Sequence, residues 1–389
     1  MSPVTILPLF VSQFTESNIL IGSTMQVQRL AWSLPLIYGA HYFSRHPFKA
    51  RRIVIITTIG RLLFTSYCLL VLLTTDVTAE VLLLLFFLAQ LFLWGSDGFT
   101  SPAWSQLLGT LVDRQIRGRV LGVSVATGGA IGALAIFIAT QVLGNQPDAK
   151  AFAKMFIFGT LVLQISHSNL GFLKESPTTT TKDSHKSLWE AGNLITDIIR
   201  QDAFFRKLVA ARVLIGLGVS CFTFVTVYGI TEFNVSVQQI GLFTTLLLVS
   251  QTVGFTLCGV ISDRFGALGL ASLGGAFVLL VALLSATTWS TSMFVIIFIC
   301  VGIATAALSI SDMTLILEFI SPDKIPGYFA SYHVIQAPIN LLAALSAGLL
   351  VDIAGFRPMF TVCAIVTAVG IAIMYVLRTQ IRKGTTVSL

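Results

Sequence analysis

The stretch KESPTTTTKDSHKSLWEAGNLITDIIRQDAFFRK, residues 174–207, is the longest polar stretch of the chain. It combines serine, threonine and charges of both signs, whereas the sequence on either side consists of apolar runs with short polar breaks. The runs on the two sides follow the same order and are interrupted at corresponding places. Residues 174–207 are therefore predicted to join two related halves, residues 1–173 and 208–378, and residues 379–389 form a tail.

The composition indicates a helical membrane protein. Of 389 residues, 55% are hydrophobic and only 11% are charged, and the mean hydropathy is +0.88. A soluble domain carries about 25% charged residues, so this chain has too little charge to cover a water-facing surface. Its apolar runs are about 20 residues long, which is the length of helix that crosses the hydrocarbon core of a bilayer. We expect an all-α protein that crosses the lipid bilayer many times.

The positions of the basic residues predict the orientation of the chain. The formal net charge is +7, and eighteen of the 24 Lys and Arg residues fall in one alternating set of loops, which includes residues 174–207 and the C-terminal tail. The intervening loops offer only Lys150 and Arg357. This asymmetry follows the positive-inside rule and places the central loop and the C-terminus in the cytoplasm. Because the positive charge reflects topology, no nucleic-acid partner is expected.

The sequence carries none of the common patterns of enzyme or metal sites. All five cysteines lie within apolar runs, at no spacing that suits a metal ion, and are interpreted as small buried hydrophobes. There is no G-x-x-x-x-G-K-[ST] phosphate loop and no H-E-x-x-H, C-x-x-C or G-x-S-x-G motif. We therefore expect neither an enzyme nor a bound cofactor.

Eleven apolar segments are long enough to cross a membrane. They are predicted at residues 18–43, 53–75, 80–110, 120–143, 151–173, 208–231, 237–260, 266–287, 292–320, 329–351 and 357–378. Residues 1–14 are apolar but too short to span, and they resemble the outer half of a helix. Two explanations are open: the natural start lies upstream, or the chain is a truncated relative of a longer protein. Residues 186–200 are compatible with a surface helix against the membrane or the helix bundle.

A weak internal repeat relates the two halves. The matched residues keep their order while the offset changes from about 220 early in the chain to 204 later: Ser17, Ile21 and Gly22 match Ser236, Ile240 and Gly241 at 219, Gly39 matches Gly259 at 220, Gly118 matches Gly327 at 209, and Asp148 and Phe152 match Asp352 and Phe356 at 204. Matches in register at four places indicate a parallel duplication. Two six-helix halves related by an axis along the membrane normal are a known architecture of membrane proteins.

Residues 259–266, GVISDRFG, carry a G-x-x-x-D-R-x-G pattern between the second and third spans of the second half. This pattern resembles a cytoplasmic loop of the major facilitator superfamily, and the counterpart in the first half keeps Gly39 but has Phe43 in place of the aspartate. The resemblance implies two six-helix bundles, here with eleven full transmembrane helices and a partial first one. It also implies a central cavity, usually lined by the first and fourth helices of each half, that opens to each side of the membrane in turn.

The resemblance further implies a conformational latch at this loop. The latch would consist of Gly259, Asp263, Arg264 and Gly266. Its partner would be Glu318, at the cytoplasmic end of the predicted helix 292–320. A charged pair at a helix end near the membrane surface can be made and broken as the two halves tilt. The alternative interpretation is that these residues only end and cap two helices.

Charged residues within the apolar runs mark candidate sites, because a charge at the bilayer centre costs about 2.5–3.5 kcal/mol even on insertion scales. Asp97 is the leading candidate for a site carboxylate, and Arg29 is expected near mid-depth, where it could pair with Asp97. Asp312 is a candidate proton-binding group. It could also pair with Arg212, although snorkelling of Arg212 to the cytoplasmic surface is favoured. Arg61 is interpreted as a structural anchor.

The function implied by the resemblance is secondary active transport of a small solute by alternating access. Coupling to a proton gradient is expected, with Asp97 or Asp312 as the titrating group. Aromatic residues of the predicted cavity helices, Tyr228 among them, favour export of an amphipathic compound, whereas a buried Arg29 would suit uptake of an anion. We expect a monomer in the plasma membrane. The alternative is a transport-inactive sensor or scaffold, or a truncated gene product, which the short first segment and Phe43 favour.

Overall fold

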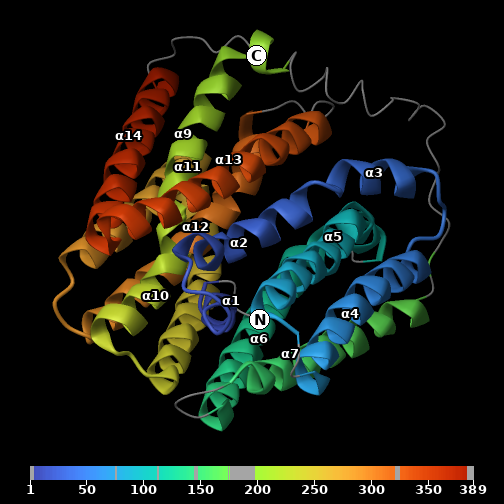
Figure 1. Ribbon diagram of the computed structural model, residues 1–389. Helices are drawn as coiled ribbons and strands as arrows, with labels where there is room; N and C mark the ends of the chain where they lie inside the picture. The colour runs from blue at the N-terminus through green and yellow to red at the C-terminus, as the bar shows by residue number, and fades with distance from the viewer. Residues whose placement is uncertain are drawn as a thin grey trace.

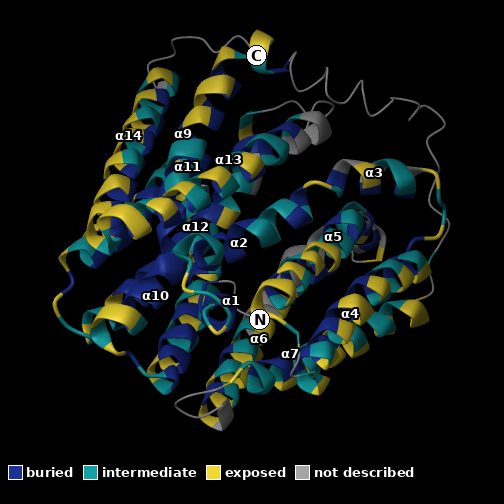
Figure 2. Ribbon diagram, viewed as in Figure 1, coloured by how far each residue is buried: buried dark blue, intermediate teal, exposed yellow. Residues whose placement is uncertain are grey.

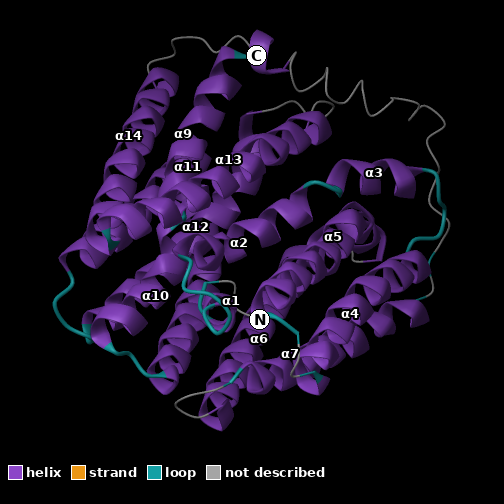
Figure 3. Cartoon of the chain, in the orientation of Figure 1, coloured by secondary structure: helices purple, strands orange, loops and turns teal. Residues whose placement is uncertain are grey.

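A computed structural model describes residues 4–74, 77–111, 114–143, 148–173, 175, 198–319 and 325–382 of the chain (Figure 1). The regular structure in these ranges is helical throughout (Figure 3). The first half contains α1 (Ile6–Val11), α2 (Asn18–Ser33), α3 (Leu36–Ser44), α4 (Ala50–Leu73), α5 (Ala79–Leu111), α6 (Arg114–Leu143), α7 (Ala149–Ser168) and the short 3-10 helix η1 (Asn169–Phe172). The second half contains α9 (Ala203–Val219), α10 (Cys221–Phe233), α11 (Val237–Thr287), α12 (Met293–Phe319), α13 (Ile325–Ala354) and α14 (Phe356–Arg382). The surface helix predicted at residues 186–200 lies mostly outside the described residues.

The outer faces of the helices are apolar. Within the described ranges, nine helical segments are long and apolar enough to cross a membrane. Large apolar side chains such as Ile59 and Leu62 of α4 and Leu349 and Ile353 of α13 are exposed. Exposed residues recur along both helices (Figure 2). A continuous exposed apolar surface of this kind is covered by hydrocarbon in a bilayer, and helices satisfy their backbone polar groups internally there. The chain is an integral membrane protein.

Residues 18–43, predicted as one helix, form two. α2 ends at Ser33 and α3 begins at Leu36, with Leu34 and Pro35 between them. Proline lacks an amide hydrogen, and its ring clashes with the preceding helical turn, so the first helix ends before it. Both pieces pack against α5 of their own half, and α2 also lies along α13 of the other half.

The second half differs from the prediction in the opposite sense, because residues 237–260 and 266–287 are joined in one element, α11. The joint is Gly266, whose φ of 73° lies in a region that residues with a side chain rarely adopt. The two crossings remain distinct, as Val237–Ser262 and Arg264–Thr287. α9 and α10 form a single crossing, Ala203–Phe233, with Ser220 between them.

Glycines bring the two halves into close contact. At Gly348 of α13, an added Cβ would lie 2.5 Å from the Cα of Ile19 and 2.8 Å from the carbonyl oxygen of Asn18, both at the start of α2. The Asn18 amide also donates a hydrogen bond of 2.8 Å to Asp352. We call this contact, Asn18 and Ile19 against Gly348 and Asp352, the outer seam, since the loop charges predict that it faces outside. Small residues permit such backbone contact between membrane helices.

A second contact between the halves joins α6 and α11. A Cβ at Gly241 of α11 would lie 1.9 Å from the hydroxyl oxygen of Thr140. Nearer the middle of the same helices, a Cβ at Gly129 would lie 1.9 Å from the hydroxyl oxygen of Thr252. In the described part of the chain, the main contacts between the halves are those of α2 with α13 and of α6 with α11, and α10 also contacts α1 and α2. The candidate site lies between the halves.

Candidate functional site

A cavity of about 610 Å³ lies between the two halves. Helices of both halves contribute its lining residues: Gln28, Arg29, Trp32 and Ser33 from α2, Trp94 from α5, Arg212, Gly216 and Val219 from α9, Phe222 from α10, Thr305, Leu308, Ser309 and Asp312 from α12, and His333, Gln336, Ala337 and Asn340 from α13. The resemblance implied walls from the first and fourth helices of each half. The structure adds α2 and α13, the helices that form the outer seam.

Arg212, Asp312 and Tyr332 form one hydrogen-bonded group at the wall of this cavity. Arg212 Nε donates to Asp312 Oδ1 at 2.8 Å and lies 2.9 Å from the Tyr332 hydroxyl oxygen, and a second guanidinium nitrogen also contacts Asp312. The Tyr332 hydroxyl donates to the same carboxylate oxygen. Arg212 is 4% exposed, so the favoured interpretation, snorkelling to the surface, is wrong. Its charge is neutralised inside the bundle, where an ionised partner is in reach.

Arg29 contributes a further positive charge to the cavity wall. Its guanidinium is close enough to Asp312 to be attracted and close enough to Arg212 to be repelled. Asp312 is already engaged by Arg212 and Tyr332, and the described residues include no hydrogen-bond or ion-pair partner of the Arg29 side chain. One carboxylate therefore faces two guanidinium groups, which leaves the described wall of the cavity with an excess of positive charge.

Aromatic and amide side chains complete the lining. Trp94 Nε1 donates to Gln90 Oε1 at 2.6 Å, which fixes the indole of Trp94. The Trp32 ring of α2 and the His333 ring of α13 lie edge to face, 6.1 Å apart across the two halves. Asn340 is buried. The cavity therefore offers aromatic surface, amide groups and charge to an occupant.

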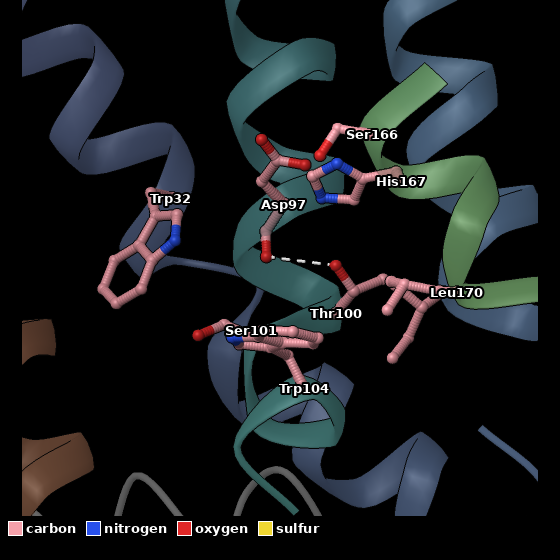
Figure 4. A pocket seen from close by; sticks show the side chains of 9 residues that line it. Trp32, Asp97, Thr100, Ser101, Trp104, Ser166, His167 and Leu170 are labelled. Carbon is pink, nitrogen blue, oxygen red and sulfur yellow. Dashed lines mark hydrogen bonds between the residues drawn. The ribbon is translucent and has the colours of Figure 1, made fainter. Parts of the chain in front are cut away.

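Asp97 lies elsewhere, in a separate pocket of about 380 Å³ within the first half (Figure 4). Arg61 of α4 donates to Asp97 Oδ1 at 3.1 Å, so the proposed partner Arg29 is replaced by the residue interpreted as an anchor. Arg29 and Asp97 line different cavities. In Figure 4 the imidazole of His167 lies beside the Asp97 carboxylate, and the Asp97 carbonyl oxygen accepts a hydrogen bond of 3.2 Å from Thr100.

Asp97 and Asp312 occupy related positions in the two halves. Their separation of 215 residues falls between the offsets of 220 and 209 found on either side of them in the repeat. Each carboxylate accepts from a buried arginine, Arg61 on α4 for Asp97 and Arg212 on α9 for Asp312. The repeat therefore relates two acids whose cations lie on helices that do not correspond, and of the two pairs only Arg212 with Asp312 lines the central cavity.

Tyr228 does not line the cavity. It is 2% exposed and packs among the rings of Phe233, Phe294, Phe356 and Phe360. Its hydroxyl group lies 3.4 Å from the Arg357 guanidinium. An amphipathic ring with a polar tip often occupies such a place near the membrane–water interface. The structure therefore places Tyr228 in a packed aromatic cluster.

The loop with the G-x-x-x-D-R-x-G pattern, residues 259–266, ends in a bend at Gly266 that is capped by a carboxylate. Glu318 Oε2 accepts a hydrogen bond of 2.7 Å from the backbone N–H of Ala267, directly after the bend at Gly266. Arg264 is exposed and makes no ion pair with Glu318 in the described part of the chain. The side chain of Asp263 lies outside the described residues. Glu318 thus contacts the loop through its backbone, where a carboxylate also meets the positive end of the helix dipole.

The first half has an equivalent cap that the sequence did not reveal. Both carboxylate oxygens of Glu175 accept from the backbone N–H of Lys49, at 2.9 and 2.8 Å, and one accepts from Ala50 at 3.0 Å. These are the first amides of α4. Burial lowers the pKa of the Lys49 ammonium, and the charge of Glu175 opposes that shift. Glu175 comes from the beginning of the central loop, 126 residues away, so local sequence offers no signal for it.

Comparison with known proteins supports this architecture. A family model described as Major Facilitator Superfamily matches residues 208–388. A POT family transporter solved in complex with 5-aminolevulinic acid superposes with a TM-score of 0.67 at 13% identity, over 98% of this chain and 96% of the other. A bacterial homolog of the human lysosomal transporter Spinster, in an inward-facing and unoccupied conformation, gives 0.64 at 15% identity over 97% and 96%. The nucleoside transporter NupG gives 0.62 at 13% identity over 97% of each chain.

No curated protein matches the chain. The structural neighbours share its fold over nearly their whole length, and they are transporters rather than enzymes. The second half carries the sequence pattern of the same class. The second half of the chain therefore matches the Major Facilitator Superfamily model, and the whole chain shares the fold of these transporters.

Proposed function

We propose that this protein is a secondary active transporter that moves a small solute across the plasma membrane by alternating access. The observation that carries the proposal is the cavity of about 610 Å³ whose walls come from both halves and whose charged lining residues are Arg29, Arg212 and Asp312. Polar and charged groups within a membrane bundle are costly and mark solute or ion pathways. The outer seam closes one side of this space through Gly348 and Asn18, and tilting of the halves would exchange the closed side.

We further propose that transport is coupled to protons through Asp312. The carboxylate is the acceptor for Arg212 and Tyr332, and Arg29 and His333 line the same cavity. A proton on Asp312 removes the charge that holds Arg212, so the guanidinium becomes available to another acceptor. Breaking a buried pair by neutralising one partner costs several kcal/mol unless a new partner replaces it. Protonation and solute binding are thereby linked through a single group.

The proposed solute is amphipathic, and the proposed direction is export in exchange for protons. Trp32, Trp94 and Phe222 provide the aromatic surface that such a compound would contact. The structural neighbours differ in what they bind or carry: the POT family transporter was solved with 5-aminolevulinic acid, NupG is a nucleoside transporter, and a further neighbour, human MFSD10, is an organic anion transporter. Their substrates therefore do not identify the solute of this chain. The protein is proposed to act as a monomer without a cofactor.

The glutamate caps at Lys49–Ala50 and at Ala267 favour transport over a transport-inactive sensor or scaffold. The alternative drew support from Phe43, which replaces an aspartate of the loop pattern. Phe43 is 1% exposed and packs in an apolar cluster with Ala103 and Leu107. The helix start that follows it is capped by Glu175, as Glu318 caps the equivalent start in the second half. Although Phe43 replaces an aspartate of the loop pattern, the first backbone N–H groups of both helices therefore still have a carboxylate acceptor.

The Asp312→Asn variant tests the coupling. Purified protein is reconstituted into acid-loaded vesicles that contain a pH-sensitive dye, and a panel of amphipathic acids, amines and neutral compounds is added outside. We expect at least one compound to raise the internal pH through the wild-type protein and to lose this effect with Asp312→Asn. Asp148→Asn is the matched control, because Asp148 is an exposed cap of α7 outside the cavity lining, and asparagine keeps its acceptor oxygen. Unchanged proton movement by Asp312→Asn would remove Asp312 from the coupling.

A further inference from the structure

A second, more apolar pocket adjoins the central cavity. A pocket of about 350 Å³ shares Gln28, Arg29 and Thr305 with the central cavity and lies between α2, α6, α11 and α12. Apart from Gln251, the rest of its lining is apolar: Val4, Met25, Gly132, Ile136, Leu247 and Leu248. An apolar cavity of about 150 Å³ is large enough to hold benzene. The side pocket therefore has room for a larger hydrocarbon group.

Arg29 lies where the two spaces meet. It lines both of them, and its guanidinium has no hydrogen-bond or ion-pair partner among the described residues. An unpaired charge at this depth is costly, and a bound anion would offset the cost through two parallel hydrogen bonds. Asp312, the only carboxylate that lines either space in the described structure, is held by Arg212 and Tyr332.

We infer that the occupant is an amphipathic anion. Its carboxylate or similar group binds Arg29, and its hydrocarbon group enters the side pocket beside Ile136, Leu247 and Leu248. The inference rests on the proposed function, because this occupant is identified with the transported solute. It assigns Arg29 and the side pocket as the determinants of solute class, a role distinct from that of Asp312 in coupling.

Gly132 provides a way to close the side pocket without disturbing the helix. It lines the pocket, and a Cβ built there meets no atom within 4 Å. A leucine at position 132 can therefore occupy the pocket without a clash at its Cβ. Gly128, one turn away on α6, is exposed and also has open space at its Cβ. Gly128→Leu is thus a matched control that adds the same side chain outside the pocket.

The test measures binding of defined probes to the full chain in lipid nanodiscs, followed by the fluorescence of Trp32 and Trp94 at the cavity wall. Octanoate, octanol and octylammonium carry the same chain with different charge, and butyrate carries the acid with a shorter chain. Empty nanodiscs correct for partition into lipid. Each methylene group that enters an apolar site contributes roughly fourfold in affinity, so octanoate is expected to bind far more tightly than butyrate.

The variants are expected to separate the contribution of the probe's carboxylate, which binds Arg29, from that of its hydrocarbon chain, which enters the side pocket. Arg29→Gln weakens octanoate binding by about tenfold or more and changes octanol binding little, whereas Arg29→Lys keeps most of the octanoate affinity. Gly132→Leu weakens octanoate by about tenfold or more and leaves butyrate nearly unchanged, and Gly128→Leu has no effect. A melting curve confirms that each variant is folded.

Three results would overturn the inference. These are octylammonium binding as tightly as octanoate, octanoate affinity unaffected by Arg29→Gln, and equal weakening of octanoate and butyrate by Gly132→Leu. Absence of saturable octanoate binding to the folded wild-type protein would overturn it as well. Binding is measured without a proton gradient, so it is tested separately from transport. If octanoate binds in an Arg29-dependent way but no compound is transported, the proposed function is wrong and the inference stands. If the protein transports cations but no anions in exchange for protons, the inference is wrong and the proposed function stands.

Discussion

Gly348→Ala provides a direct test of the outer seam as a gate. The added Cβ would lie 2.5 Å from Ile19 Cα, 2.8 Å from Ile19 N and 2.8 Å from Asn18 O. Carbon atoms in good contact are about 3.5–4.0 Å apart, so α2 and α13 must separate by roughly 1 Å at this point. All three neighbours are backbone atoms, which no change of rotamer can move away. The methyl group is therefore accommodated only by displacement of one helix from the other.

The cost falls on the state in which the seam is closed. Inserting a methyl group into a packed contact typically costs about 1–3 kcal/mol. The state with an open seam does not make this contact, so the equilibrium between the two states shifts toward opening by about 5- to 150-fold. A strongly destabilised fold would instead lower the melting temperature, and the two effects are distinguished by measuring both.

The assay is labelling of a cysteine in the cavity from outside the cell. The five native cysteines are buried, so a Gln28→Cys reporter on the cavity wall provides the accessible thiol for a membrane-impermeant maleimide. We expect Gly348→Ala to raise the labelling rate at least about fivefold. Gly128→Ala is the control, because its Cβ meets no neighbour. Equal labelling rates in folded Gly348→Ala and control protein would refute the view that this contact gates the cavity.

Five further substitutions test the Asp97–Arg61 pair and the caps formed by Glu318 and Glu175. Asp97→Asn leaves the charge of Arg61, which is 2% exposed, without its partner, and is expected to lower the free energy of unfolding by about 3–5 kcal/mol. Arg61→Gln is expected to lower it by less, because the Asp97 carboxylate that it leaves unpaired is 26% exposed to its pocket. Equal melting temperatures of the two variants would contradict this expectation. Glu318→Ala removes the acceptor for Ala267 N–H and is expected to cost about 1 kcal/mol, with a smaller loss for Glu318→Gln, which keeps an acceptor oxygen. Glu175→Ala should behave likewise at α4, and no change in melting temperature in either alanine variant would count against the caps.

Much of the fold could be predicted from the sequence because apolar length and loop charge act locally. A run of about 20 apolar residues crosses a bilayer wherever it occurs in the chain. The predicted spans therefore correspond to helices in the described ranges, and the main differences lie at particular residues. Pro35 divides α2 from α3, and Gly266 bends a continuous α11 in place of a loop.

The partners of the buried charges could not be predicted in the same way. Arg212 was favoured to snorkel and instead binds Asp312, while Asp97 was expected near Arg29 and instead binds Arg61. Each choice depends on which face of a helix meets which neighbour, and apolar composition does not specify helix rotation inside a membrane. Glu175 is the clearest case, because its cap on α4 joins residues 126 positions apart.

The sequence by itself determined that the chain is a duplicated helical membrane protein and which of its residues carry charge within the apolar runs. Only the tertiary structure decided that Arg29 and Asp312 line one cavity, that Asp97 lies in another, and that a side pocket adjoins Arg29. The physical reason is that transfer from water to hydrocarbon depends on each segment alone. An ion pair or a cavity wall depends on distances of a few ångströms between helices that are remote in sequence, and those distances are set by packing of the whole bundle.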